Sequence, residues 1–276
     1  MLRKSNWKGI AMNVVATERP PAEVYDEKFV PALFAQWGPI VSKAAGVEPG
    51  QTVLDVACGT GALTMAAAEI VGPNGRVVGL DANPEMLAVA RRKPTGIDWR
   101  EGVAEKLPFD DSSFDAVVSQ FGFMFFEDRP RALGEMMRVL KPGGRLAVTV
   151  CGAVERSPGY AAFANLLDRL FGLEVGNAFR APFALGDAEE LSRIAETAGI
   201  EGASVEDRNG TVRFRTIAEL VATERACVWT LGGLLDQDQF DLLLRESEEV
   251  LQPFADSDGF VSFDMPALIL MARKVG

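Results

Sequence analysis

Strand-like and helix-like patterns alternate along the first half of the chain. Five short segments typical of strands are separated by segments whose apolar residues recur at helical spacing. The five segments cover residues 53–57, 76–81, 97–101, 113–121 and 145–150. Strands that alternate with helices predict an α/β architecture built around a parallel sheet.

Beyond Cys151, longer helical segments dominate. They cover residues 158–171, 187–199, 216–233 and 237–252. Asp187, followed three residues later by Glu190, is typical of a helix start. Val205–Phe214 predicts one or two strands with a hairpin signal at Asn209-Gly210, and residues 260–272 alternate as a last strand. We therefore expect one α/β core that carries inserted helices over the strand ends.

Composition narrows the class of protein. The chain has 276 residues, of which 48% are hydrophobic and 24% charged, as in an ordinary globular protein. Its net charge of −11 argues against a DNA or RNA substrate, because binding to phosphate backbones relies on Lys and Arg. No apolar run reaches the roughly twenty residues of a membrane span, and the first residues lack the apolar core of a signal peptide. These observations predict a cytoplasmic protein.

A glycine turn after the first strand indicates a ligand site. Asp55 lies inside the strand, and Gly59-Thr60-Gly61 then ends it and leads into the Ala-rich helical segment 62–70. Such a turn lets a ligand approach the backbone and directs the free N–H groups of the helix toward it. The stretch therefore predicts a nucleotide-type site at the head of the sheet.

The details of this turn distinguish between nucleotides. A dinucleotide-binding loop has a third glycine where this chain has Thr64. Asp81 ends the second strand, about twenty residues after the turn, where a carboxylate can accept hydrogen bonds from both ribose hydroxyls. The glycines and the two acids together are a specific pattern, whereas Gly-x-Gly alone would be weak evidence.

Residues 50–151 resemble the core of the class I S-adenosyl-L-methionine-dependent methyltransferases, nearest the ubiquinone/menaquinone-type small-molecule branch. The run Arg138-Val-Leu-Lys-Pro-Gly-Gly144 is a further signature of this family, with a structural role as a helix-to-strand turn. The resemblance implies a Rossmann-like α/β fold with a mostly parallel seven-stranded sheet, helices on both faces and an inserted helical cap. It also implies S-adenosyl-L-methionine as the cofactor.

The expected organisation is a single methyltransferase domain over residues 1–276. A loose leader covers 1–22, and the cofactor-binding core covers 23–151. Residues 152–182 and 216–252 form the helical cap, and residues 183–215 and 253–276 complete the sheet.

The resemblance also implies which residues meet the cofactor. Gly102-Val103-Ala104 resembles the family's adenine-edge motif, but Val103 replaces its aspartate and leaves one hydrogen bond to the adenine amino group open. For Tyr25 and Met86, packing on the sheet or in the core is an alternative. The full set is Tyr25, Asp55, Ala57, Gly59, Thr60, Gly61, Asp81, Ala82, Met86, Gly102, Val103, Ala104, Ser119, Gln120 and Phe121.

The strongly apolar run after the fourth predicted strand suggests a site for a small, largely apolar methyl acceptor. Phe123, Met124 and Phe125 follow a strand end that should face the ligand crevice, although plain core packing explains them equally well. Tyr160, in the predicted cap, is the other residue that we place in this pocket.

The chain contains no histidine, which removes the commonest general base. A sulfonium carries a good leaving group, so positioning and exclusion of water are the expected mechanism. The alternative is that Tyr160, a weak candidate, or a carboxylate with a raised pKa takes the proton. The three scattered cysteines predict no metal site.

Two other functions stay open at this point. The same scaffold could use a bound sulfonium for cyclisation, elimination or decarboxylation, or it could bind the cofactor without catalysis. The expected partner is a small molecule, with no nucleic acid and no transmembrane segment, and the oligomeric state stays open, a homodimer included.

Overall fold

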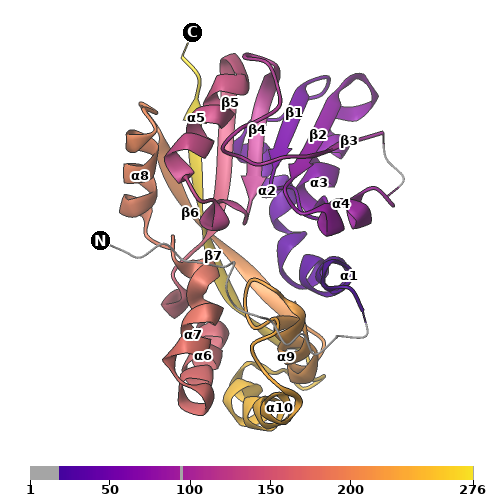
Figure 1. Ribbon diagram of the computed structural model, residues 1–276, viewed down its shortest axis with the longest axis vertical. Helices are drawn as coiled ribbons and strands as arrows, with labels where there is room; N and C mark the ends of the chain where they lie inside the picture. Colours follow the sequence, from indigo (N-terminus) through magenta and orange to yellow (C-terminus); the bar gives the residue numbers. More distant parts are fainter. Residues whose placement is uncertain (1–18, 94–95, 276) are drawn as a thin grey trace.

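In the computed structural model, which describes residues 19–93 and 96–275, seven strands form a mixed sheet in the order β3-β2-β1-β4-β5-β7-β6 (Figure 1). The strands are β1 (Thr52–Val56), β2 (Arg76–Asp81), β3 (Asp98–Glu101), β4 (Phe114–Gln120), β5 (Leu140–Cys151), β6 (Ser204–Phe214) and β7 (Val261–Arg273). The first five pair in parallel, and β7 runs antiparallel between β5 and β6. This arrangement confirms the predicted Rossmann-like, mostly parallel sheet.

Helices cover both faces of the sheet and the end where the parallel strands terminate (Figure 1). They are α1 (Pro21–Val24), η1 (Tyr25–Phe34), α2 (Trp37–Ala44), α3 (Ala62–Val71), α4 (Pro84–Ala90), α5 (Arg129–Val139), α6 (Pro158–Phe171), α7 (Leu173–Arg180), α8 (Ala188–Thr197), α9 (Ile217–Ala226) and α10 (Gln237–Leu251). Short 3₁₀ turns are η2 (Gly72–Asn74), η3 (Phe123–Phe125), η4 (Val154–Arg156), η5 (Ala181–Phe183) and η6 (Gln252–Phe254).

Side-chain caps fix where several helices begin. Asn83 accepts a hydrogen bond from the Glu85 amide at the start of α4, and Asp187 accepts from the Glu190 amide at the start of α8. The helix predicted from Asp187 therefore starts close to where it is observed.

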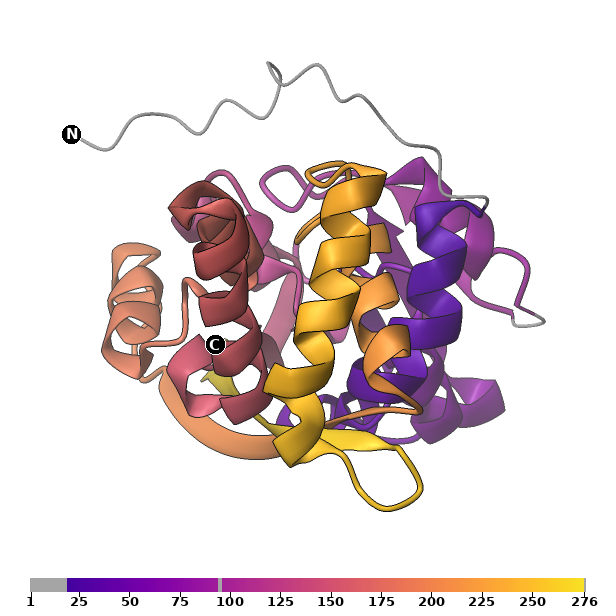
Figure 2. The same ribbon diagram turned by 90° about the horizontal axis from the view of Figure 1, so that it is seen from below.

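The cap is a row of helices from both ends of the chain. Helix α10 packs between α6 and α9, and α9 in turn contacts α1 and η1, as Figure 2 shows from below. The N-terminal helices thus belong to the same layer as the inserted ones, which places them over the ends of the strands.

Segment η1 is a π-helix that contains Pro31. A proline supplies no amide donor, which favours a departure from α-helical hydrogen bonding. The wider turn brings Tyr25, Phe29 and Phe34 together, with ring centroids of Tyr25 and Phe34 5.2 Å apart. These rings form one wall of the cavity described below.

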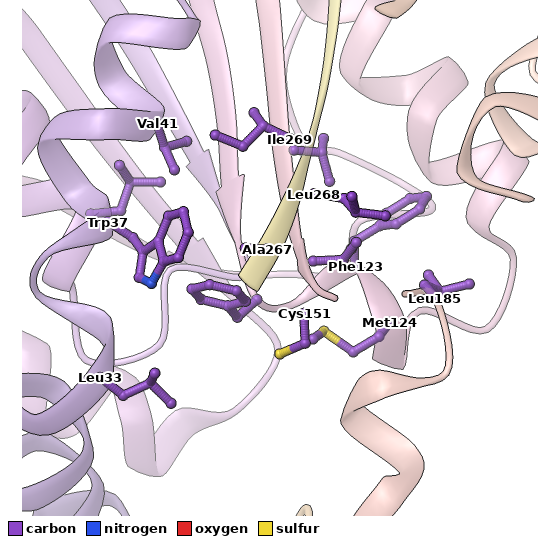
Figure 3. Close-up of a cluster of buried hydrophobic side chains, with 14 of the residues drawn as sticks. Leu33, Trp37, Val41, Phe123, Met124, Cys151, Leu185, Ala267, Leu268 and Ile269 are labelled. Atoms are coloured by element: carbon purple, nitrogen blue, oxygen red, sulfur yellow. The ribbon is translucent and has the colours of Figure 1, made fainter. Parts of the chain in front are cut away.

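Trp37 lies in the core, as its place on an apolar helix face predicts. Its side chain is fully buried, near Leu33 and Val41 in Figure 3, and its ring meets the edge of Phe121. A Cβ atom on Gly210 would lie only 2.3 Å from Cζ2 of Trp37. The hairpin prediction at Asn209-Gly210 is therefore wrong. Strand β6 runs straight through this glycine, which gives the indole room rather than making a turn.

Three predicted boundaries also differ. The Lys141–Gly144 turn is a bulged start of β5, where the register with β4 shifts between Phe114 and Ala116. The helix predicted to reach Gly233 ends at Ala226. Of the predicted leader, residues 1–18 lie outside the described part, and α1 begins at Pro21, earlier than predicted.

Candidate functional site

A cavity of about 850 Å³ lies at the carboxyl ends of the parallel strands. Gly59, Asp81, Phe121 and Cys151, which follow or end β1, β2, β4 and β5, all line it. Ligands of open α/β sheets bind in the crevice at this edge, and the volume is within the range of about 300–1,000 Å³ usual for ligand sites.

Asp81 is the main charged group at one end of this cavity. Its carboxylate accepts hydrogen bonds from the Gly59 amide at 2.7 Å and the Asn83 amide at 2.8 Å. Burial raises the pKa of Asp81, while these amides act in the opposite direction. Since a carboxylate offers about four acceptor positions, Asp81 retains capacity for the two hydroxyls of a ribose.

The two glycines of the turn have different roles. Both have a positive φ, +57° at Gly59 and +94° at Gly61, which favours glycine. A Cβ atom at Gly61 would lie 2.5 Å from Cη2 of Trp99, so this glycine makes room for a packed indole. A Cβ atom at Gly59 would meet only the Tyr25 ring, at 3.9 Å, and both residues line the cavity.

Two non-glycine residues with positive φ also line the cavity. They are Ala57, with φ +59°, after β1, and Phe121, with φ +53°, after β4. A left-handed conformation costs an ordinary residue on the order of 1 kcal/mol, and such residues cluster at ligand sites.

Asp55 lies behind the cavity wall instead of in it. It is buried and accepts a hydrogen bond from the Thr64 hydroxyl at 2.5 Å, which links β1 to α3. Burial raises the pKa of Asp55 to about 7. Thr64, which stands where a dinucleotide loop has its third glycine, thus supports the acid beneath the turn.

The structure brings most of the predicted cofactor-binding residues together. Those that line the cavity are Tyr25, Ala57, Gly59, Asp81, Ala82, Met86, Gly102, Val103, Ala104, Gln120 and Phe121. Asp55, Thr60, Gly61 and Ser119 lie outside the lining, and three of these, Asp55, Thr60 and Ser119, are buried polar residues. Gln120 donates to the Phe34 carbonyl at 3.1 Å, whereas its Oε1 atom is buried with no partner among the described residues.

The predicted acceptor pocket needs one correction. Met124, Phe125 and Tyr160 line the cavity, but Phe123 does not. The Phe123 side chain is fully buried and packs edge-to-face on Phe126, within the cluster that includes Leu268 (Figure 3). The 3₁₀ turn η3 directs its side chains to different sides, so Phe123 enters the core while Phe125 reaches the cavity.

Several lining residues were not predicted. Phe179 and Phe183 extend the apolar wall from the α7 region, and Met265 extends it from β7. Glu224, Cys227, Trp229 and Thr230 enter from the end of α9 and the turns after it. They lie in the part of the chain where the family resemblance is thin, so motif reading gave no guide to them.

Glu224 is an acidic residue that was not predicted to line the cavity, and it lies where the end of α9 enters it. It is 2% exposed and accepts a hydrogen bond from the Thr230 hydroxyl at 2.9 Å. Burial raises the pKa of Glu224 to about 7. A signal was present in the sequence, because Glu224 continues the apolar stripe of Ile217, Leu220 and Val221 at helical spacing.

Within residues 19–93 and 96–275, no helix is both long and apolar enough to cross a bilayer. Nor do three or more His, Cys, Asp or Glu residues gather there as a possible metal site.

Comparison with known proteins agrees with this geometry. The chain is 38% identical over 161 residues to a demethylmenaquinone methyltransferase of Chlorobaculum tepidum. The aligned region covers 55% of this chain and 66% of the relative. It is 35% identical over 190 residues to the demethylmenaquinone methyltransferase of Staphylococcus carnosus, 64% of the chain and 78% of the relative. The match to the first relative thus falls just short of two thirds of its length.

The fold itself has solved counterparts. The YcgJ protein of Bacillus subtilis superposes with a TM-score of 0.56 at 22% identity, covering 87% of this chain and 99% of that one. At this identity the likeness concerns the fold. The model of the ubiE/COQ5 methyltransferase family matches residues 32–171, which include the glycine turn, Asp81 and the ends of β4 and β5. The chain therefore belongs to the ubiE/COQ5 methyltransferase family.

Proposed function

We propose that this chain transfers a methyl group from S-adenosyl-L-methionine to a small, largely apolar acceptor. The proposal rests on one observation. A single cavity joins Asp81 and the glycine turn to an apolar chamber roofed by the cap. The cofactor supplies a methyl group on a sulfonium, and the protein's task is to align the acceptor with it and to exclude water.

The residues at the sheet end fit the cofactor. In this proposal Asp81 accepts from the ribose hydroxyls, while Met86 and Val103 enclose the adenine. The unpartnered Oε1 atom of Gln120 is available to accept from the amino group of the methionine part. Tyr25 in η1 and Phe121 after β4, whose rings each contact Phe34, close the same end.

The acceptor chamber is mostly aromatic and aliphatic. Phe125, Phe179, Phe183 and Met265 supply apolar surface, and Trp229 lies 6.0 Å from Phe125 between ring centroids. In this proposal residues 23–151 form the cofactor half, and the cap segments 152–182 and 216–252 enclose the acceptor together with Phe125, Phe183 and Met265. The names of the relatives suggest quinone-type compounds as the first acceptors to try.

The test is transfer of label from methyl-labelled S-adenosyl-L-methionine. We would use reduced demethylmenaquinone and 1,4-dihydroxynaphthalene as acceptors, together with fractionated small-molecule extract, and analyse the products by mass spectrometry. Label in a product, lost when Asp81 is replaced, would support the proposal. Cofactor binding without transfer to any acceptor would instead favour a different use of the bound sulfonium.

A further inference from the structure

The apolar chamber contains one polar cluster, formed by Glu224, Tyr160 and Thr230. Glu224 and Tyr160 are each only 2% exposed, and all three residues line the cavity. The Thr230 hydroxyl donates to Glu224 Oε2 at 2.9 Å, and the same oxygen contacts the Glu224 carbonyl at 3.1 Å. The Tyr160 hydroxyl is buried and faces the Glu224 carboxyl, with which it interacts, although no partner among the described residues meets the geometry of an ordinary hydrogen bond.

Such a cluster is under-satisfied as it stands. A buried carboxylate with one hydroxyl donor and a buried phenol with no firm partner both lack hydrogen bonds that water would supply. A ligand hydroxyl could donate to Glu224 and accept from Tyr160 in the same position. The cluster therefore has the form of a binding site for one hydroxyl group in an otherwise apolar chamber.

The titratable groups that face Glu224 leave its surroundings uncharged near neutral pH. They are Tyr160 from α6, Cys151 from β5 and Cys227 after α9. Burial raises the pKa of both thiols to about 12 and that of Tyr160 well above its usual value, so all three stay neutral near pH 7. The basic residue of the cavity lining, Arg131, donates instead to the Glu105 carbonyl beside the adenine-edge segment.

We propose that Glu224 accepts the proton of the methyl acceptor, and that the acceptor carries a hydroxyl on an otherwise apolar body. This inference rests on the proposed function and names the acceptor class for it. The oxygen of this hydroxyl, or a conjugated carbon that loss of the hydroxyl proton activates, forms a bond to the methyl carbon while the S–CH₃ bond breaks and its electron pair stays on sulfur. The hydroxyl proton passes to a carboxylate oxygen of Glu224, and the Tyr160 hydroxyl holds the acceptor oxygen in place.

The proposal accounts for the missing histidine. A carboxylate whose pKa burial raises to about 7 can take a proton near neutrality, as a histidine would. The structure thus points to the second of the two mechanisms that the sequence left open, with Glu224 in place of the weaker candidate Tyr160.

The first test uses binding alone. In the presence of S-adenosylhomocysteine, calorimetry would compare the binding of 1-naphthol and 1-methylnaphthalene. In the second compound a methyl group replaces the hydroxyl. We expect the wild type to prefer 1-naphthol about tenfold and Glu224→Leu to lose the preference. Glu219→Gln is the matched control, because Glu219 is on the same helix but outside the cavity lining. No preference in the wild type, or a preference that survives in Glu224→Leu, would overturn the proposal.

The second test uses the pH profile of methyl transfer to 1,4-dihydroxynaphthalene, kept reduced. The wild type should show an acid limb in kcat/KM near pH 7 that does not move with a more acidic acceptor. Glu224→Gln keeps a hydrogen-bond acceptor but should lower kcat by at least about 100-fold and abolish the limb. A limb unchanged in this variant would remove Glu224 as the base. Absence of transfer in the wild type would count against the proposed function, and the binding comparison would still decide the role of Glu224.

Discussion

The Asp81 carboxylate accepts a hydrogen bond from the Gly59 amide at 2.7 Å, so the end of β2 and the turn after β1 form one surface. A second bond, from the Asn83 amide at 2.8 Å, extends this surface to the start of α4. The acid proposed to hold the ribose therefore also orders the backbone around it.

Replacing Asp81 by Ala should weaken S-adenosyl-L-methionine binding by roughly 30- to 1,000-fold. The reason is the loss of charge-assisted hydrogen bonds worth about 2–4 kcal/mol. Isothermal titration calorimetry would measure the change. Glu85→Ala is the control, since Glu85 is exposed on the first turn of α4 and does not line the cavity. Affinity within threefold of the wild type in Asp81→Ala would place the ribose elsewhere.

Phe123 and Phe125 should respond differently to replacement by Ala. Phe125 lines the cavity and is 40% exposed, so its loss should raise the KM for the acceptor and leave the fold intact. Phe123 is fully buried, so its loss should lower the free energy of unfolding by about 3–5 kcal/mol. Steady-state kinetics and urea denaturation would separate the two effects. The same kinetic defect in both variants would contradict the assignment.

The buried acids should make the protein less stable as the pH rises. The pKa of Glu224 is about 7 in the fold against its usual 4.5, so the folded state binds more protons than the unfolded chain between these values. Stability from this group is present at pH 5 and is lost as the pH rises through 7, by up to about 3 kcal/mol. Asp55, also raised to about 7, acts in the same direction.

Urea denaturation of Glu224→Gln from pH 5 to 8 would isolate this effect. The variant should gain stability relative to the wild type as the pH increases. Glu219→Gln provides the contrast, because its ion pairs with Arg215 and Lys28 lower the pKa of Glu219 to about 2. Its stability difference from the wild type should therefore stay constant over the same range. A constant difference for Glu224→Gln as well would mean that Glu224 keeps an ordinary pKa.

Two glycine-to-alanine substitutions should have opposite signs. At Gly210 the new methyl group would lie 2.3 Å from the Trp37 ring, so we expect a loss of about 1–3 kcal/mol from overpacking. At Gly134, inside α5, the added methyl group meets nothing within 4 Å, so we expect a gain of about 1 kcal/mol from helix propensity. Thermal and urea unfolding would measure both. A harmless Gly210→Ala would show that the indole has room to move.

The cofactor end of the site could be predicted because its chemistry is local in sequence. The turn at Gly59 and the acid at Asp81 each follow directly from a strand end, and parallel strands bring such ends to one edge. The boundaries of α6 and α10 were likewise close, because apolar spacing and capping residues mark them.

The acceptor end could not be predicted in the same way. Glu224 became a cavity residue only because α9 turns its buried stripe toward the ends of the strands, a matter of tertiary packing. The direction of Phe123 depends on one 3₁₀ turn, and the role of Gly210 depends on Trp37, 173 positions earlier in the chain. Local patterns carry no information on such long-range contacts.

The cap helices α7, α9 and α10 all follow residue 171, where the family match ends; α7 continues from α6 after β5, and α9 and α10 lie in the chain between β6 and β7. The parallel strands that carry Gly59 and Asp81 are built without them. We therefore expect mutations in α7 and α10 to change the choice of acceptor more than cofactor binding, whereas Trp229, after α9, packs against Tyr25 of the proposed cofactor end. Under the proposed function, a gene for such a protein can diversify its repertoire of acceptors through the residues after 171, well under half of its length, which makes the cap the natural region for directed evolution of new specificities.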